Sequence, residues 1–167
     1  MSTIIVYTIV SFLLDGLVSN FISGSIHNSS MFNTIYSVIA LVIIYNYFDN
    51  NSKFLKILFV LGILFDIVYT NTFLLNIFIF IVIYIILGMI NNYIPNNIFT
   101  INVKTLLAVF IYHILSYIIL SIANYDSYSY ILLMVLPRSV IMTIIYTSFS
   151  YIMIKKIYFK RYTKKIK

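Results

Sequence analysis

The chain has 167 residues, of which 62% are hydrophobic and only 9% are charged, and its formal net charge is +7. This composition is typical of a polytopic membrane protein and leaves no room for a soluble domain. The absence of cysteine excludes disulfides, thiolate metal sites, a cysteine nucleophile and cysteine lipidation.

Hydropathy divides the chain into six apolar segments, separated by short polar breaks rich in Asn, Ser and Asp. Each segment is close to the ~20 residues that a helix needs to cross a bilayer. In chain order the predicted helices are 3–23, 31–48, 54–71, 73–91, 101–122 and 130–154. The narrow break at Asn71-Thr72 predicts a tight helical hairpin. The predicted fold class is therefore all-α, with a transmembrane domain over 1–154 and a basic tail over 155–167.

Basic residues occur beside alternate breaks only. Lys53 and Lys56 flank the second break and Lys104 follows the fourth, whereas the first, third and fifth contain none. The others fill the tail, as Lys155, Lys156, Lys160, Arg161, Lys164, Lys165 and Lys167. Because basic loops stay on the cytoplasmic side of a membrane, this pattern predicts six spans with both termini in the cytoplasm.

The tail is first of all an anchor that holds the last helix in place. Its six residues Lys155, Lys156, Lys160, Arg161, Lys164 and Lys165 are also candidate contacts for anionic lipid or for an acidic cytoplasmic partner. Nucleic acid is not an expected partner, because no folded module accompanies the basic run.

Four ionisable residues fall inside apolar segments, in the half of the predicted bilayer that faces outward: Asp15, Asp66, His113 and Arg138. We expect Arg138 to pair with Asp15 or Asp66, because a guanidinium stays charged in almost any surroundings. The group could be a structural network, a partner-binding surface or a proton or solute path. Asp15-x-x-x-Ser19-Asn20 also recurs as Asp66-x-x-x-Thr70-Asn71, which suggests a parallel repeat.

Two further residues bear on helix packing. Pro137 lies early in the last predicted helix, where it removes a backbone hydrogen bond and predicts a kink. Gly62 lies one turn before Asp66 and is a candidate for close helix packing.

Catalytic patterns are missing from the sequence. The two histidines show no metal-ligand spacing, the four glycines make no phosphate loop, and no Gly-x-Ser-x-Gly elbow occurs. No enzymatic activity, cofactor or metal is therefore expected.

The string Gly62-Ile-Leu-Phe-Asp66-Ile-Val, followed by a long apolar helix that holds Gly88, resembles the Gly-x-x-x-Asp signature of the rod shape-determining protein MreD family. The length, the six segments, Pro137 and the short basic tail are also similar to that family. The resemblance implies a non-enzymatic, multi-pass scaffold in the bacterial cytoplasmic (inner) membrane. Its implied partners are MreC, other membrane proteins of the elongation complex that organises peptidoglycan synthesis and rod shape, and MreB on the cytoplasmic side.

The alternative is the substrate-binding S component of an energy-coupling factor transporter, which has a similar length and span number and takes up a vitamin or metal. Such a protein needs a polar pocket open to the outside and small residues on its first helix for docking. The first predicted helix, 3–23, contains no alanine. A small lipid-modifying enzyme, a third class, lacks its catalytic groups here.

Overall fold

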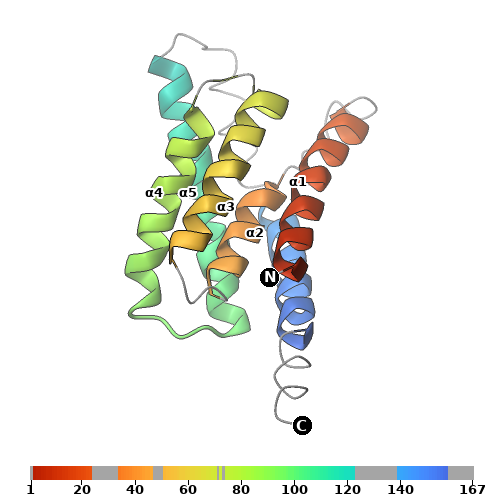
Figure 1. The fold of residues 1–167 in the computed structure, drawn as a ribbon, viewed down its shortest axis with the longest axis vertical. Coiled ribbons are helices and arrows are strands. Elements are labelled where there is room, and N and C mark those ends of the chain that lie inside the picture. Colours follow the sequence, from red (N-terminus) through yellow and green to blue (C-terminus); the bar gives the residue numbers. More distant parts are fainter. Residues whose placement is uncertain are drawn as a thin grey trace.

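The computed structural model describes residues 2–23, 34–46, 51–70, 72, 74–122 and 139–157. All regular structure within these ranges is helical, so the all-α prediction is confirmed. The elements are α1 (Ser2–Ser23), α2 (Tyr36–Tyr45), α3 (Asn51–Phe65), the π-helical turn η2 (Asp66–Thr70), α4 (Leu75–Asn91), α5 (Ile98–Ile122) and a last helix, Ser139–Ile157 (Figure 1).

Helix α2 is the centre of the bundle. Every residue from Tyr36 to Ile44 is buried, and the helix contacts both α1 and α5. Its sequence is apolar on all sides, as expected for a helix enclosed by others. With ten residues it is about 15 Å long, half of the ~30 Å hydrocarbon core of a bilayer. The predicted span 31–48 was therefore too long, because the chain is not yet helical at Thr34 and Ile35.

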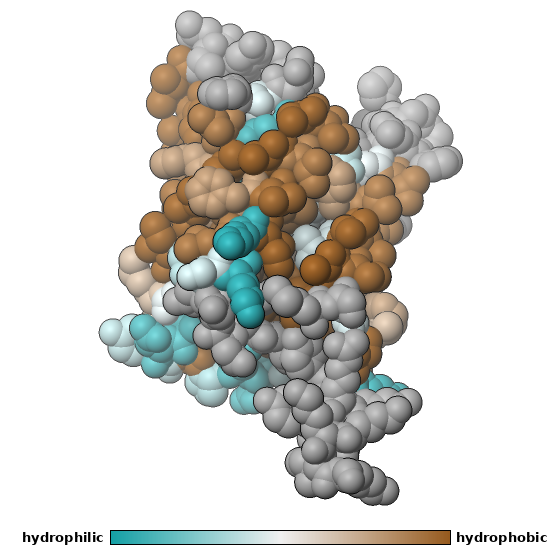
Figure 2. Space-filling view, viewed as in Figure 1, coloured by the Kyte–Doolittle hydropathy of each residue, from teal (hydrophilic) through white to brown (hydrophobic). Residues whose placement is uncertain are grey.

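Two helices in the described part of the chain, Ile98–Ile119 and Ser139–Ile157, are long and apolar enough to cross a membrane by length and composition. Three further apolar helices, Thr3–Val18, Tyr36–Tyr45 and Leu75–Asn91, are shorter. Large apolar side chains also cover much of the exterior, and most of the hydrophilic colour on the face in Figure 2 lies in its lower half. This apolar exterior suits a hydrocarbon environment better than water.

Helices α3 and α4 form the hairpin predicted at Asn71-Thr72. They approach closely at Gly62, where an added Cβ would lie 2.7 Å from Ile77 Cγ1 and 2.9 Å from Ile77 Cα. Leu74, directly before α4, adopts a left-handed backbone conformation, with φ 63° and ψ 5°. A left-handed backbone is unfavourable for a bulky residue, so other contacts must hold this turn.

The last helix is joined to the bundle largely through hydroxyl groups. Thr143 pairs with Thr34 at 2.6 Å, and Thr147 donates to Thr105 of α5 at 3.1 Å. Near the middle of the helix, Tyr146 Oη lies 2.9 Å from Ser11 Oγ of α1. These bonds satisfy buried polar groups that would otherwise be costly in an apolar interior.

Candidate functional site: two carboxylates that cap helices

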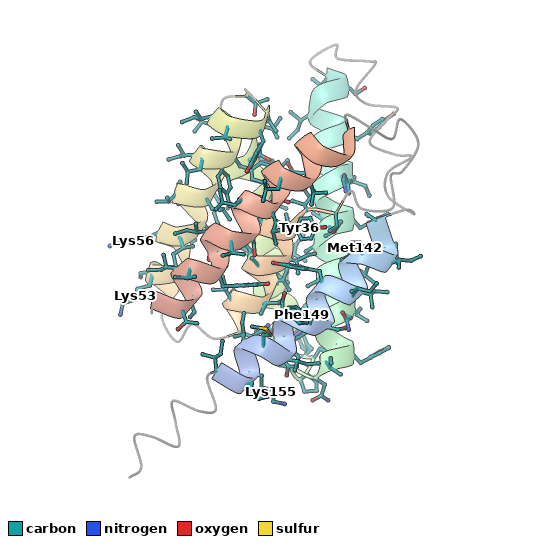
Figure 3. All side chains as sticks on the ribbon, turned by 90° about the vertical axis from the view of Figure 1, so that its right-hand side faces the viewer. Tyr36, Lys53, Lys56, Met142, Phe149 and Lys155 are labelled. Atoms are coloured by element: carbon teal, nitrogen blue, oxygen red, sulfur yellow. The ribbon has the colours of Figure 1, made fainter. Side chains whose placement is uncertain are left out.

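Asp15 of α1 caps the amino terminus of α2. Its Oδ1 accepts the backbone N–H of Tyr36 at 2.7 Å, and its Oδ2 accepts the backbone N–H of Ser37 at 2.9 Å. The Ser37 hydroxyl also donates to Oδ2. The first N–H groups of a helix have no partner within that helix and carry the positive end of its dipole, so an internal carboxylate satisfies both. Tyr36 lies near mid-height of the molecule (Figure 3), and both Tyr36 and Ser37 are buried, at 3% and 0% exposure.

Asp66 does the same for α4, ten residues along the chain. Its Oδ1 accepts the backbone N–H of Asn76 at 3.0 Å and the Asn76 side-chain amide at 2.9 Å. The hydroxyl of Thr72 donates to the same oxygen at 2.7 Å. Asp66 is 4% exposed and opens the π-helical turn η2, so this carboxylate fixes both the end of α3 and the start of α4.

The Gly-x-x-x-Asp string therefore works as one structural unit. Gly62 lies in the last turn of α3, and Asp66, the first residue of η2, follows one turn later. The glycine lets the backbone of Ile77 approach, and the aspartate holds the neighbouring residue, Asn76. In α1 the small residue one turn before Asp15 is Ser11, which is fully buried. Both carboxylates of the suggested repeat thus cap the helix that follows their own.

Asn76 is the hub of the second site, and sequence reasoning missed it. It is fully buried, donates to Asp66 and to the hydroxyl of Thr70, and accepts the phenolic O–H of Tyr112 from α5 at 2.6 Å. It therefore ties η2, α4 and α5 together. An amide inside an apolar run was the available signal, because such a group needs partners as an ionised one does.

The structure does not bring His113 into contact with either aspartate. His113 of α5 is 4% exposed, and neither of its ring nitrogens has a hydrogen-bond partner among the described residues. The same holds for the hydroxyl of Ser116 and for Oδ2 of Asp66. Tyr7 Oη and Asn46 Oδ1 are also buried without a partner among the described residues. Buried polar atoms without partners are rare, so these five residues hold chemically open positions of the bundle.

Lys104, which in the sequence served only to predict orientation, has an enclosed ammonium group. It is 2% exposed, and its Nζ donates to Asn91 Oδ1 at 2.5 Å, Asn96 Oδ1 at 2.7 Å and the Ile94 carbonyl at 3.2 Å. Three neutral oxygens therefore replace the water around this ammonium. The sequence placed Lys104 beside the fourth break, but it did not indicate that the side chain is enclosed by that break.

Several predicted site residues lie outside the described ranges: Pro137, Arg138, Lys160, Arg161, Lys164 and Lys165. The predicted pairing of Arg138 with an aspartate stays a prediction. Of the tail, Lys155 and Lys156 are described and both are exposed, with Lys155 Nζ 5.7 Å from the centre of the Tyr151 ring.

No group of three or more His, Asp or Glu side chains within the described ranges could hold a metal ion. The two carboxylates are instead bound to backbone and side-chain donors of neighbouring helices. What this arrangement can do chemically is to fix the register of α1 with α2 and of α3 with α4.

No protein-family model, curated protein or solved structure matches the chain. The assignment of function therefore rests on the residues and their geometry.

Proposed function

We propose that this chain is a non-enzymatic membrane scaffold of the MreD type, with six membrane-embedded helices and both termini in the cytoplasm. It would bind MreC and help to organise peptidoglycan synthesis at the bacterial cytoplasmic membrane, with MreB as a cytoplasmic partner. Its intramembrane charges serve the assembly of the bundle, and its outer apolar surfaces serve its contacts.

The observation that carries this proposal is that internal carboxylates fill the helix starts. A helix that begins inside a bundle presents free N–H groups and a positive dipole end, which transporters use to bind anionic groups of their substrates. Here Asp15 fills that position at α2 and Asp66 fills it at α4. A protein that used these helix starts for a solute would keep them open.

The distribution of lysines supports the proposed orientation. Lys53 and Lys155 lie in the lower half of the molecule in Figure 3, which also holds the starts of α1 and α3 and the end of the last helix, and Lys56 lies further along α3, close to mid-height. Lys104 lies against the connection between α4 and α5 at the same end. Basic residues at one end agree with placement of that end in the cytoplasm.

Co-purification tests the proposal. The tagged chain, expressed with MreC from its own cells and extracted in mild detergent, should retain MreC in stoichiometric amount. Asp66→Asn is the informative variant: a carboxylate that serves only the assembly of the bundle leaves MreC bound, whereas loss of MreC at normal abundance of the chain would place Asp66 in the interface. Retention of the energising subunits of an energy-coupling factor transporter, with no MreC, would overturn the proposal.

The S component of such a transporter is the second candidate. One observation favours it, namely the buried atoms that lack partners among the described residues, in His113, Ser116 and Asp66. A vitamin or metal bound there would raise the melting temperature of the purified protein by mass action, and His113→Ala would abolish that rise. The scaffold proposal expects no such rise with either class of solute.

A further inference from the structure

A groove runs between the first half of α1 and the middle and end of α3. Its volume is about 360 Å³. It is lined by Ile5, Thr8, Ile9, Phe12, Lys56, Ile57, Val60, Leu61 and Leu64. The Thr8 hydroxyl is the groove's single polar side-chain group on α1; it is 6% exposed and donates its proton to the Ile4 carbonyl of its own helix at 2.9 Å, so it has no donor left for a ligand. The walls therefore suit a hydrocarbon chain.

The groove has lysines at one end only. Lys56 lines that end, and Lys53 stands one turn earlier on α3; both are exposed and point away from the bundle (Figure 3). Neither forms a hydrogen bond or ion pair within the described part of the chain. From Lys56 to Leu64 the groove wall rises about 12 Å. This length fits within one leaflet, which is half of a hydrocarbon core about 30 Å thick.

A second groove of equal size provides a natural comparison. It lies between α5 and the last helix, and its volume is about 370 Å³. It is lined by Val103, Leu106, Leu107, Val109, Phe110, Ser139 and Val140. No charged residue lines it, and the nearby Lys104 is enclosed by its three oxygen acceptors. The two grooves thus differ chiefly in the pair of free ammonium groups.

We propose that the groove between α1 and α3 binds an anionic phospholipid of the cytoplasmic leaflet. One acyl chain lies along the aliphatic walls, and the phosphate sits at the ammonium groups of Lys53 and Lys56. A basic pair at the headgroup level attracts negative lipid, while the groove below it replaces the contacts that the chain makes with other lipids. The inference rests on the proposed membrane placement but not on the identity of the protein partner.

The absence of tryptophan from the chain gives a direct test. Leu64→Trp places a single tryptophan, which can be excited selectively over the 16 tyrosines, at the far end of the first groove, and Leu107→Trp places one in the second. The two leucines are matched, because they are 41% and 38% exposed. Each reporter protein is reconstituted in phosphatidylcholine vesicles that contain a minor share of brominated phosphatidylglycerol or, in the matched sample, of brominated phosphatidylcholine.

We expect brominated phosphatidylglycerol to quench the Leu64→Trp reporter at a share at least about fivefold lower than brominated phosphatidylcholine, the factor that corresponds to one lysine near a phosphate. The change K53Q/K56Q should remove this preference, whereas K155Q/K156Q, with the same loss of charge, should keep it. Raising the salt from 0.1 to 1 M shortens the screening length from about 10 to 3 Å and should remove it without any mutation of the lysines. The Leu107→Trp reporter should be quenched equally by both lipids.

Equal quenching of the Leu64→Trp reporter by the two lipids would overturn the proposal, as would a preference that survives both K53Q/K56Q and high salt. Weak quenching by both lipids, with strong quenching at Leu107→Trp, would show that something other than lipid fills the groove. Absence of quenching at both reporters would instead overturn the membrane placement itself.

Discussion

The two capping sites differ in how completely their carboxylates are used. At Asp15 both oxygens accept bonds, with Oδ1 on one backbone N–H of α2 and Oδ2 on the next. At Asp66 all three donors converge on Oδ1, and Oδ2 has no partner among the described residues although the side chain is 4% exposed. The first site is chemically closed, whereas the second retains an open acceptor.

This difference separates two roles that the sequence could not separate. A closed carboxylate can only hold its helix, and its removal strands backbone donors inside the bundle. An open one can hold its helix and still accept a bond from a further group that reaches the interior of the bundle, such as another part of this chain. Of the two aspartates, Asp66 is therefore the one with capacity for a further contact, and it is also the aspartate in the string that resembles the MreD family.

The largest expected effect is that of Asp15→Asn compared with Asp66→Asn. An asparagine at position 15 has one acceptor oxygen in place of two, so at least one backbone N–H of Tyr36 or Ser37 loses its partner. We expect a loss of about 1.5–3 kcal/mol in the free energy of unfolding, the range for a bond to a charged group. At position 66 the single oxygen can keep all three donors, and the loss should be about 0.3–1 kcal/mol, from the missing charge at the helix start.

Reversible unfolding in mixed micelles, followed by circular dichroism, measures both values. Equal destabilisation by the two variants would contradict the comparison. It would indicate that Oδ2 of Asp66 accepts a bond from a group outside the described ranges. Arg138 would then be the first to test, by combining Arg138→Leu with Asp66→Asn, since replacing both members of a buried pair costs less than breaking it.

The sequence located both carboxylates but not what they do. A carboxylate in an apolar segment is costly in free energy, so hydropathy alone is enough to single out Asp15 and Asp66. Their donors lie 21 and 22 residues away for Asp15, and 6 and 10 residues away for Asp66. Hydropathy measures preference for the membrane and not where backbone hydrogen bonding begins. For this reason the segment 31–48 was predicted as a full span, although α2 starts only at Tyr36, where the carboxylate meets it.

The neutral polar residues of the two sites were not predicted, for a related reason. The sequence argument considered ionisable groups, so Asn76 and Ser37 were passed over although both are fully buried. Lys104 was recognised by its charge, but its enclosure depends on Asn91 and Asn96, two among many asparagines of the chain. Only the fold selects which of these asparagines meet an ammonium group.

The next effect concerns two glycines at helix contacts, and it compares Gly62→Ala, where α3 meets α4, with Gly88→Ala, where α4 meets α2. At Gly62 the new methyl would lie 2.9 Å from Ile77 Cα, a backbone atom that cannot move without shifting α4. Overpacking of this kind costs about 1–3 kcal/mol. At Gly88 the nearest atom is the end of a side chain, Tyr45 Oη, at 3.3 Å. There the better helix propensity of alanine should stabilise by up to about 1 kcal/mol.

The same unfolding measurement in micelles gives the sign of each change. A neutral Gly62→Ala would mean that α4 can retreat from α3 without loss, and the Gly-x-x-x-Asp string would then lose its role as one packing unit. If Gly62→Ala displaces Ile77, the hydrogen bonds of Asp66 to Asn76 should weaken as well, because Asn76 is the residue before Ile77.

The smallest effect tests whether the Asp66 cap holds a strained turn. The described residues of α1 and α2, which the Asp15 cap joins, include no residue with a left-handed backbone. Leu74 precedes α4 with φ 63°, and its side chain is 51% exposed, so little packing is lost on its removal. Leu74→Gly relieves about 1–2 kcal/mol of left-handed strain and adds roughly 0.5–1 kcal/mol of chain entropy to the unfolded state. We therefore expect a net gain near 0.5–1 kcal/mol in the free energy of unfolding.

The control is Leu75→Gly, one residue into α4, which should destabilise by about 1 kcal/mol or more. If Leu74→Gly destabilised as much as the control, the turn would not be strained, and the demand on Asp66 would be no greater than that on Asp15.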